Sequence, residues 1–265
     1  MKRLHITGCP RSGTTLALEL LATCFQVDHR CGHEQSVFQP VPAGEGVSVS
    51  KQPTDIVHVH KVLAEDENLH VLYMLRDPRA VVTSRHASTN EYFSNYRVWK
   101  ECESAARKLV DHPRVLQIRY EDLVSYPDIY QQIIQSKFPF LHQTHRFSDF
   151  SSFATPNADS LQALNGLRPI EISSLRKWTQ HLPRVKSQLA RFPQMQDDLE
   201  YRRYEPDTRW QSALAGVDDE VHACRYSDRK PVFKELEKSL RIWVKAERYR
   251  RHVRQSKTAL PALKA

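Results

Sequence analysis

The stretch Gly8-Cys9-Pro10-Arg11-Ser12-Gly13-Thr14-Thr15 decides the fold, because it lies between a short apolar run and a segment with helical spacing. Two glycines at G-x-x-x-x-G spacing allow the backbone to form a nest of N–H donors, and the helix N-terminus that follows favours an anion. A loop that holds a triphosphate with Mg²⁺ normally carries Lys before Ser or Thr. Here Thr14 stands at that lysine position, and Arg11 is the only cation of the loop. The stretch therefore predicts a site for a single 5′ phosphate carrying a reactive group, with Arg11 near the bond that breaks.

Apolar runs alternate with segments of helical spacing through about residue 140. The expected strands are residues 4–7, 55–60, 70–75 and 114–119, and the expected helices are residues 14–25 and 79–96. Residues 35–54, rich in Pro and Gly without periodicity, are expected to form a surface loop. This order predicts an α/β fold: a P-loop-type, doubly wound parallel sheet flanked by helices, with right-handed crossovers. Such sheets bind ligands at the carboxyl ends of their strands, where Arg11 and Arg76 both stand.

The rest of the chain, from about Thr144, is expected to be mostly helical. Residues 1–210 are interpreted as the α/β domain and residues 211–265 as a basic helical extension, with a long helix from about residue 231 to residue 255. Its apolar stripe is Phe233, Leu236, Leu240, Trp243 and Val244, opposite Lys234, Lys238, Arg241, Lys245 and Arg248. A basic amphipathic helix can make a peripheral contact with an anionic membrane. The alternative is a helix packed on the domain with its basic face in water.

The composition is typical of a soluble, basic protein. Of the 265 residues, 40% are hydrophobic, which supports a real core, and the formal net charge of +8 favours an anionic ligand or partner. The five cysteines are odd in number and lack a C-x-x-C pattern, which indicates free thiols in a reducing compartment. No segment approaches the ~20 apolar residues of a membrane span, and the N-terminal run is too broken for a signal peptide. A cytoplasmic location is therefore expected.

A second motif, Arg76-Asp77-Pro78-Arg79-Ala80-Val81-Val82-Thr83-Ser84-Arg85, follows the most apolar expected strand. Arg76 ends that strand, and Ser84 is expected two helical turns into the next helix. Together they can place a guanidinium and a hydroxyl on one phosphate, since Arg offers a fork of donors matched to phosphate oxygens. Taken alone, Arg76 would first suggest a structural ion pair with Asp77 or Glu121. With the N-terminal loop, it suggests a nucleotide phosphorylated at both its 5′ and 3′ positions.

Over about residues 4–210 the chain resembles the sulfotransferases that use 3′-phosphoadenosine 5′-phosphosulfate (PAPS). Four segments carry the resemblance in the order that the family has them: CPRSGTTL at residues 9–16, RDPRAVVTS at residues 76–84, IRYEDLV at residues 118–124 and RKWTQHLP at residues 176–183. The resemblance implies an O-sulfotransferase that moves a sulfuryl group from PAPS to an acceptor hydroxyl. Its product from the cofactor would be adenosine 3′,5′-bisphosphate, and it would need no metal.

Within that family the motifs are most similar to those of the tyrosylprotein sulfotransferases. RCGHE at residues 30–34 resembles their RCGEE, and KWTQHLP at residues 177–183 resembles their KWTGHIP. The match implies that Glu34 is the catalytic base and that Arg11 stabilises the leaving group. Lys61, which follows the expected His58-x-His60 strand, is the implied counterpart of an assisting lysine. The implied cofactor contacts are Pro10, Arg11, Ser12, Gly13, Thr14 and Thr15 of the loop, Arg76 and Ser84 at the 3′ phosphate, Tyr120 at the adenine, and Trp178.

The sequence departs from the tyrosylprotein enzymes at points that bear on location and acceptor. Their membrane anchor and disulfide conditions are missing, and the stretch from Glu34 to Arg76 is shorter. Gln35 and Ser36 follow the implied base, where those enzymes carry a Thr-Arg pair that helps to hold acidic peptides, and Gln162 replaces a serine that helps the cofactor. The expected acceptors are therefore a sugar hydroxyl, then a small-molecule alcohol or phenol, and last a protein tyrosine.

Sulfuryl transfer needs a base at the attacking hydroxyl, positive charge at the leaving group and a donor fixed for attack. Glu34 suits the first role, with its neighbour His33 as a rival base, and Arg11 and Lys61 suit the second. His58 and His60 lack a third ligand at metal-binding spacing, so no metal site is expected.

Three alternatives stay open. A P-loop small-molecule kinase would need Lys at position 14 and Mg²⁺. A non-catalytic anion-, nucleotide- or nucleic-acid-binding module would use the net charge without chemistry, and would show aromatic residues among its basic stretches. Only the last helix, with Trp243 and Tyr249, hints at that pattern, so nucleic acid is the less favoured partner. A degenerate sulfotransferase would bind the cofactor without turnover, although Arg11, Glu34 and Arg76 are all present.

Overall fold

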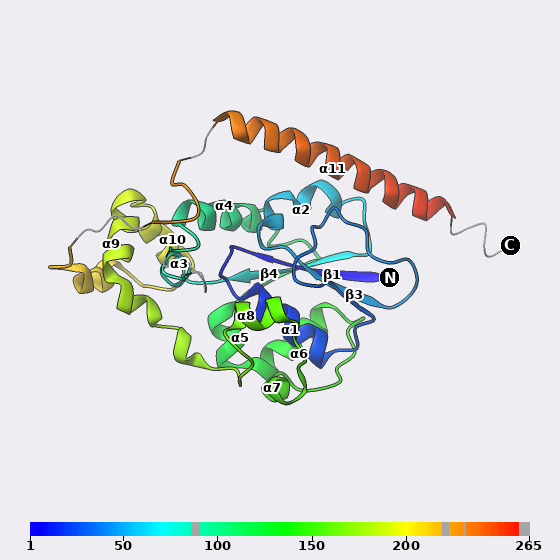
Figure 1. Ribbon diagram of the computed structural model, residues 1–265, viewed down its shortest axis with the longest axis horizontal. Coiled ribbons are helices and arrows are strands. Elements are labelled where there is room, and N and C mark those ends of the chain that lie inside the picture. Colours follow the sequence, from blue (N-terminus) through cyan, green and yellow to red (C-terminus); the bar gives the residue numbers. More distant parts are fainter. Residues whose placement is uncertain (86–90, 219–222, 230–231, 260–265) are drawn as a thin grey trace.

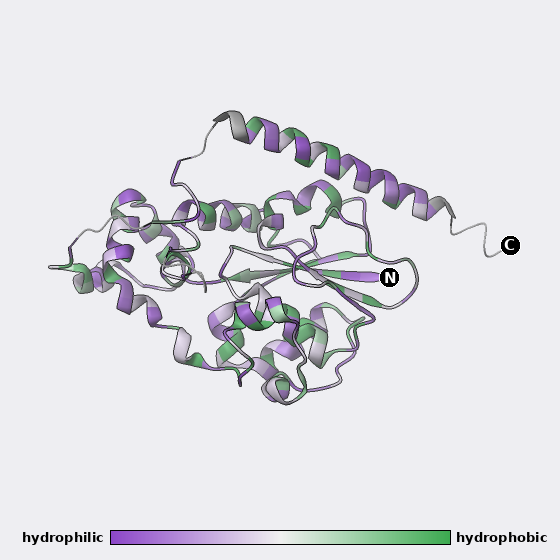
Figure 2. Cartoon of the chain, viewed as in Figure 1, coloured by the Kyte–Doolittle hydropathy of each residue, from purple (hydrophilic) through white to green (hydrophobic). Residues whose placement is uncertain are grey.

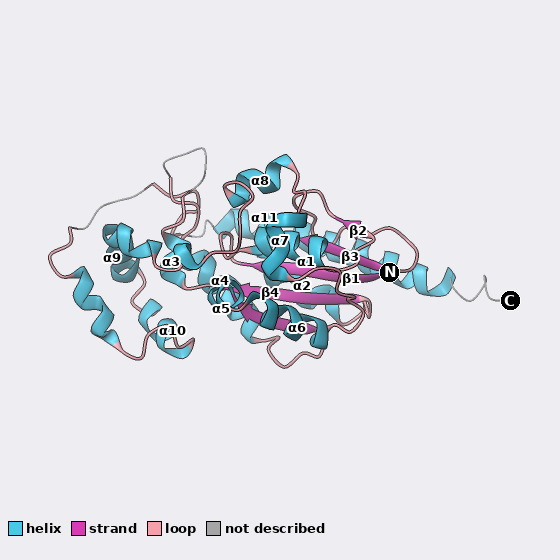
Figure 3. Ribbon diagram, turned by 90° about the horizontal axis from the view of Figure 1, so that it is seen from below, coloured by secondary structure: helices cyan, strands magenta, loops and turns pink. Residues whose placement is uncertain are grey.

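Five parallel strands form one sheet in the part of the chain that the computed structural model describes, which is residues 1–85, 91–218, 223–229 and 232–259. The strands are β1 (Lys2–Gly8), β2 (His29–Arg30), β3 (Val47–Lys51), β4 (Leu69–Leu75) and β5 (Val115–Arg119). Their order across the sheet is β2-β3-β1-β4-β5, so β1 lies at the centre (Figure 3). The expected parallel α/β sheet is confirmed, and all carboxyl ends of its strands lie at the same edge.

Helices cover both faces of this sheet (Figure 1). One face carries α1 (Thr14–Cys24), α5 (Tyr120–Ser125), α6 (Pro127–Lys137), α7 (Phe150–Phe153) and α8 (Ala158–Leu164). The other carries α2 (Ile56–Leu63), α4 (Tyr96–Arg107) and the long α11 (Val232–Ala259). The short α3 (Pro78–Val82) lies with α9 (Leu182–Arg191) and α10 (Met195–Tyr201) at the end of the molecule away from the N-terminus. Short 3₁₀ helices complete the chain: η1 (Pro53–Asp55), η2 (Phe147–Asp149), η3 (Ile172–Ser174), η4 (Lys177–His181) and η5 (Thr208–Leu214).

The strands supply alternate side chains to two hydrophobic cores, as expected for a sheet buried on both faces. On β4, Val71 and Tyr73 join the core that includes α2 and α4, whereas Leu72 and Met74 join the core that includes α1 and α6. The continuous apolar run of β4 thus reflects two packed faces rather than one.

Most expected elements near the site are confirmed. The strands at residues 4–7, 70–75 and 114–119 correspond to β1, β4 and β5, and the helix at residues 14–25 corresponds to α1. The region after Thr144 is mainly helical, and the expected C-terminal helix is α11. Among the described helices, none combines the length and apolarity that crossing a membrane requires.

Residues 35–60 correct the sequence analysis. The expected loop at residues 35–54 contains β3, whose Val-Ser-Val-Ser-Lys residues are all buried. The expected strand at residues 55–60 is instead α2, with Ile56, Val59, Val62 and Leu63 buried at helical spacing. Because α2 is a helix, His58 and His60 do not lie on one side of a strand.

The expected helix at residues 79–96 is also wrong. Only α3 forms at its start, and Thr83 ends α3 with its hydroxyl donating to the Arg79 carbonyl at 2.7 Å. The next described helix, α4, begins after Asn95, whose side chain accepts a hydrogen bond from the Val98 N–H at 3.1 Å. Ser84 therefore lies beyond the end of α3 rather than within a helix, and residues 86–90 lie outside the described residues.

The buried side chain of Arg3 forms hydrogen bonds that hold residues 36–39, before β3, in place. Its side chain is 1% exposed, and its Nε donates to Ser50 Oγ at 2.8 Å. Its terminal nitrogens donate to the carbonyls of Ser36, Val37 and Gln39 at 2.8–3.0 Å. One guanidinium thus satisfies backbone acceptors that the sheet leaves unpaired, as buried polar groups require.

We predict that Arg3→Met lowers the free energy of unfolding by about 3 kcal/mol, because it removes the donor to the carbonyls of Val37 and Gln39 and to the hydroxyl of Ser50. The neighbouring Lys2→Met is the matched control, since Lys2 is exposed on the same strand and should change stability by less than about 0.5 kcal/mol. Urea denaturation of both variants measures the difference. Equal stability of the two variants would contradict the role assigned to Arg3.

Candidate functional site

A cavity of about 1000 Å³ opens at the carboxyl ends of the strands. The sequence-predicted site residues that line it are Pro10, Arg11, Gly13, Thr14, Thr15, Glu34, Arg76, Ser84, Tyr120 and Trp178. His33, the rival base, lines it too. Two predicted residues do not: Ser12 is fully buried in the loop beneath, and Lys61 lies on α2. The structure therefore brings residues from distant parts of the chain into one pocket.

The loop after β1 has the backbone of an anion-binding nest. Arg11 and Gly13 both adopt left-handed φ angles, 75° and 92°. Gly13 is the N-cap of α1, and as a glycine it has no side chain that could cap this helix. Because the first N–H groups of a helix have no partners within the helix, they are available to an anion in the cavity.

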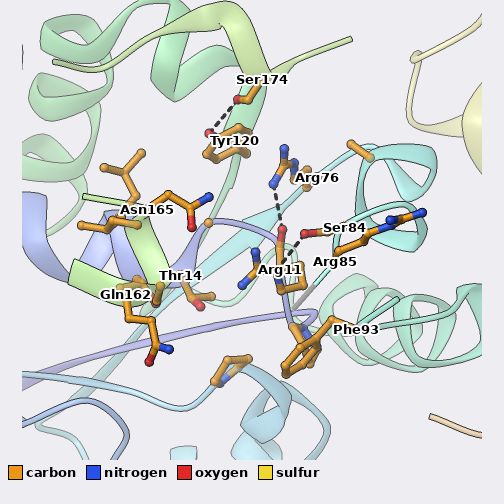
Figure 4. Close-up of a pocket in the computed structure, with 18 of the residues that line it drawn as sticks. Arg11, Thr14, Arg76, Ser84, Arg85, Phe93, Tyr120, Gln162, Asn165 and Ser174 are labelled. Carbon is orange, nitrogen blue, oxygen red and sulfur yellow. Dashed lines mark hydrogen bonds between the residues drawn. The ribbon is translucent and has the colours of Figure 1, made fainter. Parts of the chain in front are cut away.

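Arg11 and Arg76 are linked at this loop by a hydrogen bond from one side chain to the other residue's backbone (Figure 4). Arg11 Nε donates to Ser84 Oγ at 2.8 Å, and Arg76 Nη1 donates to the Arg11 carbonyl at 2.9 Å. Burial and the charge of Arg76 lower the pKa of Arg11. The two motifs predicted as separate anion sites are thus directly joined, and both positive charges belong to the same cavity.

Arg76 is not a structural ion-pair residue. Asp77, one of its suggested partners, pairs with Arg79 at 2.7 Å. Glu121, the other, accepts hydrogen bonds from the Asp77 N–H at 3.0 Å and from the Tyr204 hydroxyl at 3.2 Å. Among the described residues, no hydrogen-bond acceptor contacts the buried Nε of Arg76. A free donor on a partly buried guanidinium beside an anion nest is the feature expected of a phosphate site.

The ring of Tyr120 packs against the loop that follows β1. The Arg76 guanidinium lies 4.3 Å from the centre of its ring, and its hydroxyl is 3.1 Å from Ser174 Oγ (Figure 4). A Cβ on Gly13 would come within 2.4 Å of this ring, so the loop and the aromatic side chain are closely packed. Tyr120 is therefore placed to present a flat surface to a planar group bound beside the loop.

Lys51 lines the cavity, and the sequence analysis did not single it out. It ends β3 with its side chain 2% exposed, and its Nζ lies 3.2 Å from Thr15 Oγ1 and 3.4 Å from Glu34 Oε1. Burial lowers its pKa, and the nearby Glu34 carboxylate acts in the opposite direction. The alternating Val-Ser-Val-Ser sequence before it was the available signal, since it marks a strand that ends in lysine.

Lys61 cannot take that place. The implied role for Lys61 depended on a strand at residues 55–60, but that segment is α2, and Lys61 lies near its end. Gln52, Pro53 and Thr54, which lie just before α2, line the cavity, whereas Lys61 is not among the lining residues. The end of β3 supplies Lys51 instead.

His33 and Glu34 both reach the cavity. Burial, followed by the charge of Lys51, lowers the pKa of His33, so its ring is mainly neutral at neutral pH. The Glu34 side chain is 40% exposed and faces Lys51. Either residue can therefore accept a proton from a group in the cavity, as the sequence analysis left open.

The wall beyond Arg11 comes from segments that no motif indicated. Phe93 N–H donates to the Ser84 carbonyl at 2.9 Å, and Arg225 N–H donates to the Tyr92 carbonyl at 3.0 Å. The Phe93 ring lies 5.7 Å from the Arg11 guanidinium and 5.0 Å from that of Arg225. Tyr226 continues this wall. Part of the C-terminal extension thus contributes to the cavity.

Trp178 lines the cavity, but most of its side chain is buried against Arg79. It is 8% exposed, and the Arg79 guanidinium lies 4.1 Å from the centre of its ring. Arg79 in turn pairs with Asp77 and with Glu205, the latter at 2.5 Å. This buried group supports the second motif next to Arg76.

In the described part of the chain, three or more His, Cys, Asp or Glu side chains do not gather as they would around a metal ion.

Comparison with known proteins found no matching family model and no significantly similar curated protein. Among solved structures, a sulfotransferase domain from the Synechococcus PCC 7002 olefin synthase is 21% identical over half of each chain, with a TM-score of 0.37. The sulfotransferase domain from the curacin biosynthetic pathway is 18% identical over 77% of this chain and 98% of its own, with a TM-score of 0.45. A retinol dehydratase, solved with androsterone and the inactive cofactor PAP, is 14% identical over 96% of this chain and 81% of its own, with a TM-score of 0.30.

We predict that Gly13→Ala destabilises the protein more than Gly44→Ala does. Both glycines have positive φ angles, 92° and 125°, which cost an alanine about 1 kcal/mol or more. Only at position 13 would the new Cβ collide with Tyr120, because nothing lies within 4 Å of a Cβ on Gly44. The clash should add about 1–3 kcal/mol to the loss in unfolding free energy, measured by urea denaturation. Equal losses would show that Tyr120 does not pack on the loop.

Proposed function

We propose that this protein is a sulfotransferase that moves a sulfuryl group from PAPS to an acceptor hydroxyl. The observation that carries the proposal is the junction of Arg11 and Arg76 above a loop that has Thr14 where a nucleotide kinase has lysine. A kinase loop would direct a lysine and Mg²⁺ to a triphosphate. Two guanidiniums in one pocket instead favour a nucleotide with two separate phosphate groups.

The residues present fit such a donor. The loop N–H groups, Thr14, Thr15 and Lys51 would hold the 5′ phosphosulfate, and Arg76, with its unpartnered Nε, would hold the 3′ phosphate. Ser84, assigned to the 3′ phosphate in the sequence analysis, would act by orienting Arg11 through the observed hydrogen bond. Tyr120 would support the adenine. The bound donor supplies an activated sulfuryl group, and the protein supplies position and charge.

The chemistry assigned to the chain needs a base and nearby positive charge. Glu34 would take the proton of the acceptor hydroxyl, with neutral His33 as the alternative. Lys51 and Arg11 would face the charge that develops as the bond to the phosphate breaks, because Lys51 is a buried cation and Arg11 a partly buried cation at the loop. The Lys51 contact with Glu34 also fixes the carboxylate toward the loop.

The acceptor would approach along the wall of Phe93, Tyr226 and Arg225. Two aromatic rings with centres 6.2 Å apart offer apolar surface, and the guanidinium offers hydrogen bonds. These features favour a sugar or a small-molecule alcohol or phenol over a protein tyrosine.

Adenosine 3′,5′-bisphosphate should bind the protein, and Arg76→Ala should weaken that binding by about tenfold to a hundredfold, because hydrogen bonds to charged groups are worth ~1.5–3 kcal/mol. Arg209→Ala is the matched control, since its side chain is 83% exposed. Isothermal titration calorimetry, with ATP and Mg²⁺ titrated in parallel, measures the affinities. Binding of ATP without the bisphosphate would overturn the proposal in favour of a kinase. Bisphosphate binding without transfer to any acceptor would indicate a non-catalytic or degenerate protein.

The two lysines give a second test. Lys51→Met should lower the rate of sulfuryl transfer by about 10²–10³-fold, as loss of one preorganised charge does in other active sites. Lys61→Met should leave the rate near that of the unmodified protein. The measurement is transfer of radiolabelled sulfate from PAPS to a panel of sugars and phenols. A larger loss at position 61 than at position 51 would contradict the assignment.

A further inference from the structure

The helix α11 is fixed to the domain mainly by its C-terminal half. The hydroxyl of Tyr249, a residue only 4% exposed, donates to Asp66 Oδ2 at 2.6 Å. Arg254 pairs with Glu65 at 2.8 Å, and Lys257 pairs with Glu67 at 2.6 Å. This half of the helix therefore has a defined site on the acidic turn that follows α2.

The N-terminal half of α11 exposes large apolar side chains. Leu236 is 66% exposed, Leu240 is 64% exposed and Trp243 is 55% exposed. Their spacing of four and three residues places them on one face, which we call the apolar ridge. The helix packs on the domain through a different face: Ala246 and Tyr249 are buried in the core, and Ile242 and Val253 pack against it. The helix therefore packs on the domain with its basic face in water, one of the two expected arrangements, but through a face other than the predicted apolar stripe; the side chains of Phe233 and Lys234 lie outside the described residues.

A basic flank lies on the opposite side of the helix from the ridge, as the sequence pattern predicts. Arg241, Lys245 and Arg248 are all exposed and define this basic flank. Within the described part of the chain, Arg241 has one long contact, 3.5 Å to the exposed Glu237, and neither Lys245 nor Arg248 has an ion pair. In Figure 2, α11 lies on the outside of the molecule, with hydrophobic and hydrophilic residues alternating along it.

We propose that α11 docks on an anionic lipid surface, with the apolar ridge inserted at the headgroup level and the basic flank facing lipid phosphates. Exposed Trp beside leucine suits the membrane interface, where an amphipathic ring contacts both apolar and polar groups. Charge complementarity favours anionic lipid, since each juxtamembrane Lys or Arg strengthens binding to it. A second copy of the chain fits less well, because a stable protein interface buries about 800 Å² on each partner. The three side chains of the ridge, at one end of a helix, would bury far less area than this.

The test uses the full-length protein with two kinds of vesicle: pure phosphatidylcholine, and an equimolar mixture of phosphatidylcholine and phosphatidylserine. Co-sedimentation should occur with the mixed vesicles and be weak with the neutral ones. Trp243 fluorescence should shift to the blue on binding, because Trp243 leaves water while Trp99 and Trp178 are already buried.

Two sets of variants separate the ridge from the flank. Leu240→Ser with Trp243→Ser should abolish the binding and the shift, and Lys245→Glu with Arg248→Glu should weaken binding by at least about tenfold. Arg191→Glu with Arg209→Glu is the matched control; it makes the same charge change at exposed residues away from α11 and should bind like the unmodified protein. Thermal denaturation and bisphosphate binding check that each variant is folded.

Several outcomes would overturn the proposal. Equal binding to neutral and mixed vesicles would remove the role of the basic flank. An equal loss of vesicle binding in the control variant would show that binding depends only on the net charge of the protein. A concentration-dependent dimer in analytical ultracentrifugation without vesicles, lost in the ridge variant, would make a second copy of the chain the partner.

Discussion

Positive charge concentrated at the carboxyl ends of parallel strands is the constraint on which the rest of this structure depends. Arg11 follows β1, Lys51 ends β3 and Arg76 follows β4, and each is at least partly buried. Burial lowers the pKa of Arg11 and of Lys51. A base with a lowered pKa in the folded state destabilises the fold at neutral pH, and the cost fades only as the pH rises through that lowered pKa toward the ordinary value. An anionic ligand offsets this cost, so binding and stability are coupled through the same side chains.

The scaffold around the two arginines, Arg11 and Arg76, holds them without pairing either with a carboxylate of the described residues. Each carboxylate near the second motif is engaged elsewhere: Asp77 and Glu205 pair with Arg79, and Glu121 accepts from a backbone N–H and a tyrosine hydroxyl. Arg76 is positioned by a carbonyl and an aromatic ring rather than by an acid. Neutral partners fix the direction of a guanidinium but leave its charge available, which a site for phosphate groups requires.

The sequence predicted the parts of the fold where local and global signals agree. The Gly-rich loop, α1, β4 and β5 each combine a strong apolar pattern with a clear boundary. The prediction failed where both helical spacing and strand alternation fit the same residues. Ile56, Val59 and Val62 suit a helix, although the alternation of valine and histidine between them suits a strand. In β3, Ser50 hydrogen-bonds to Arg3 and His5, and Ser48 hydrogen-bonds to His29, so both serines are satisfied by residues far away in the sequence, which no local pattern reveals. Lys51 was missed for that reason, and Lys61 took its place in the interpretation.

The same ambiguity explains α11. Its sequence contains two apolar stripes at helical spacing, one through Leu236, Leu240 and Trp243 and one through Ile242, Ala246, Tyr249 and Val253. Apolar content alone does not determine which of the two stripes packs on the domain. The choice comes from polar contacts at the far end of the helix, since the Tyr249 hydroxyl bonds to Asp66 and two cations pair with the neighbouring glutamates. Once these contacts set the rotation of the helix, the other stripe has to face outward. The exposed ridge is thus a consequence of how the helix is anchored, and a helix whose anchoring leaves an apolar face in water is more stable when a surface covers that face.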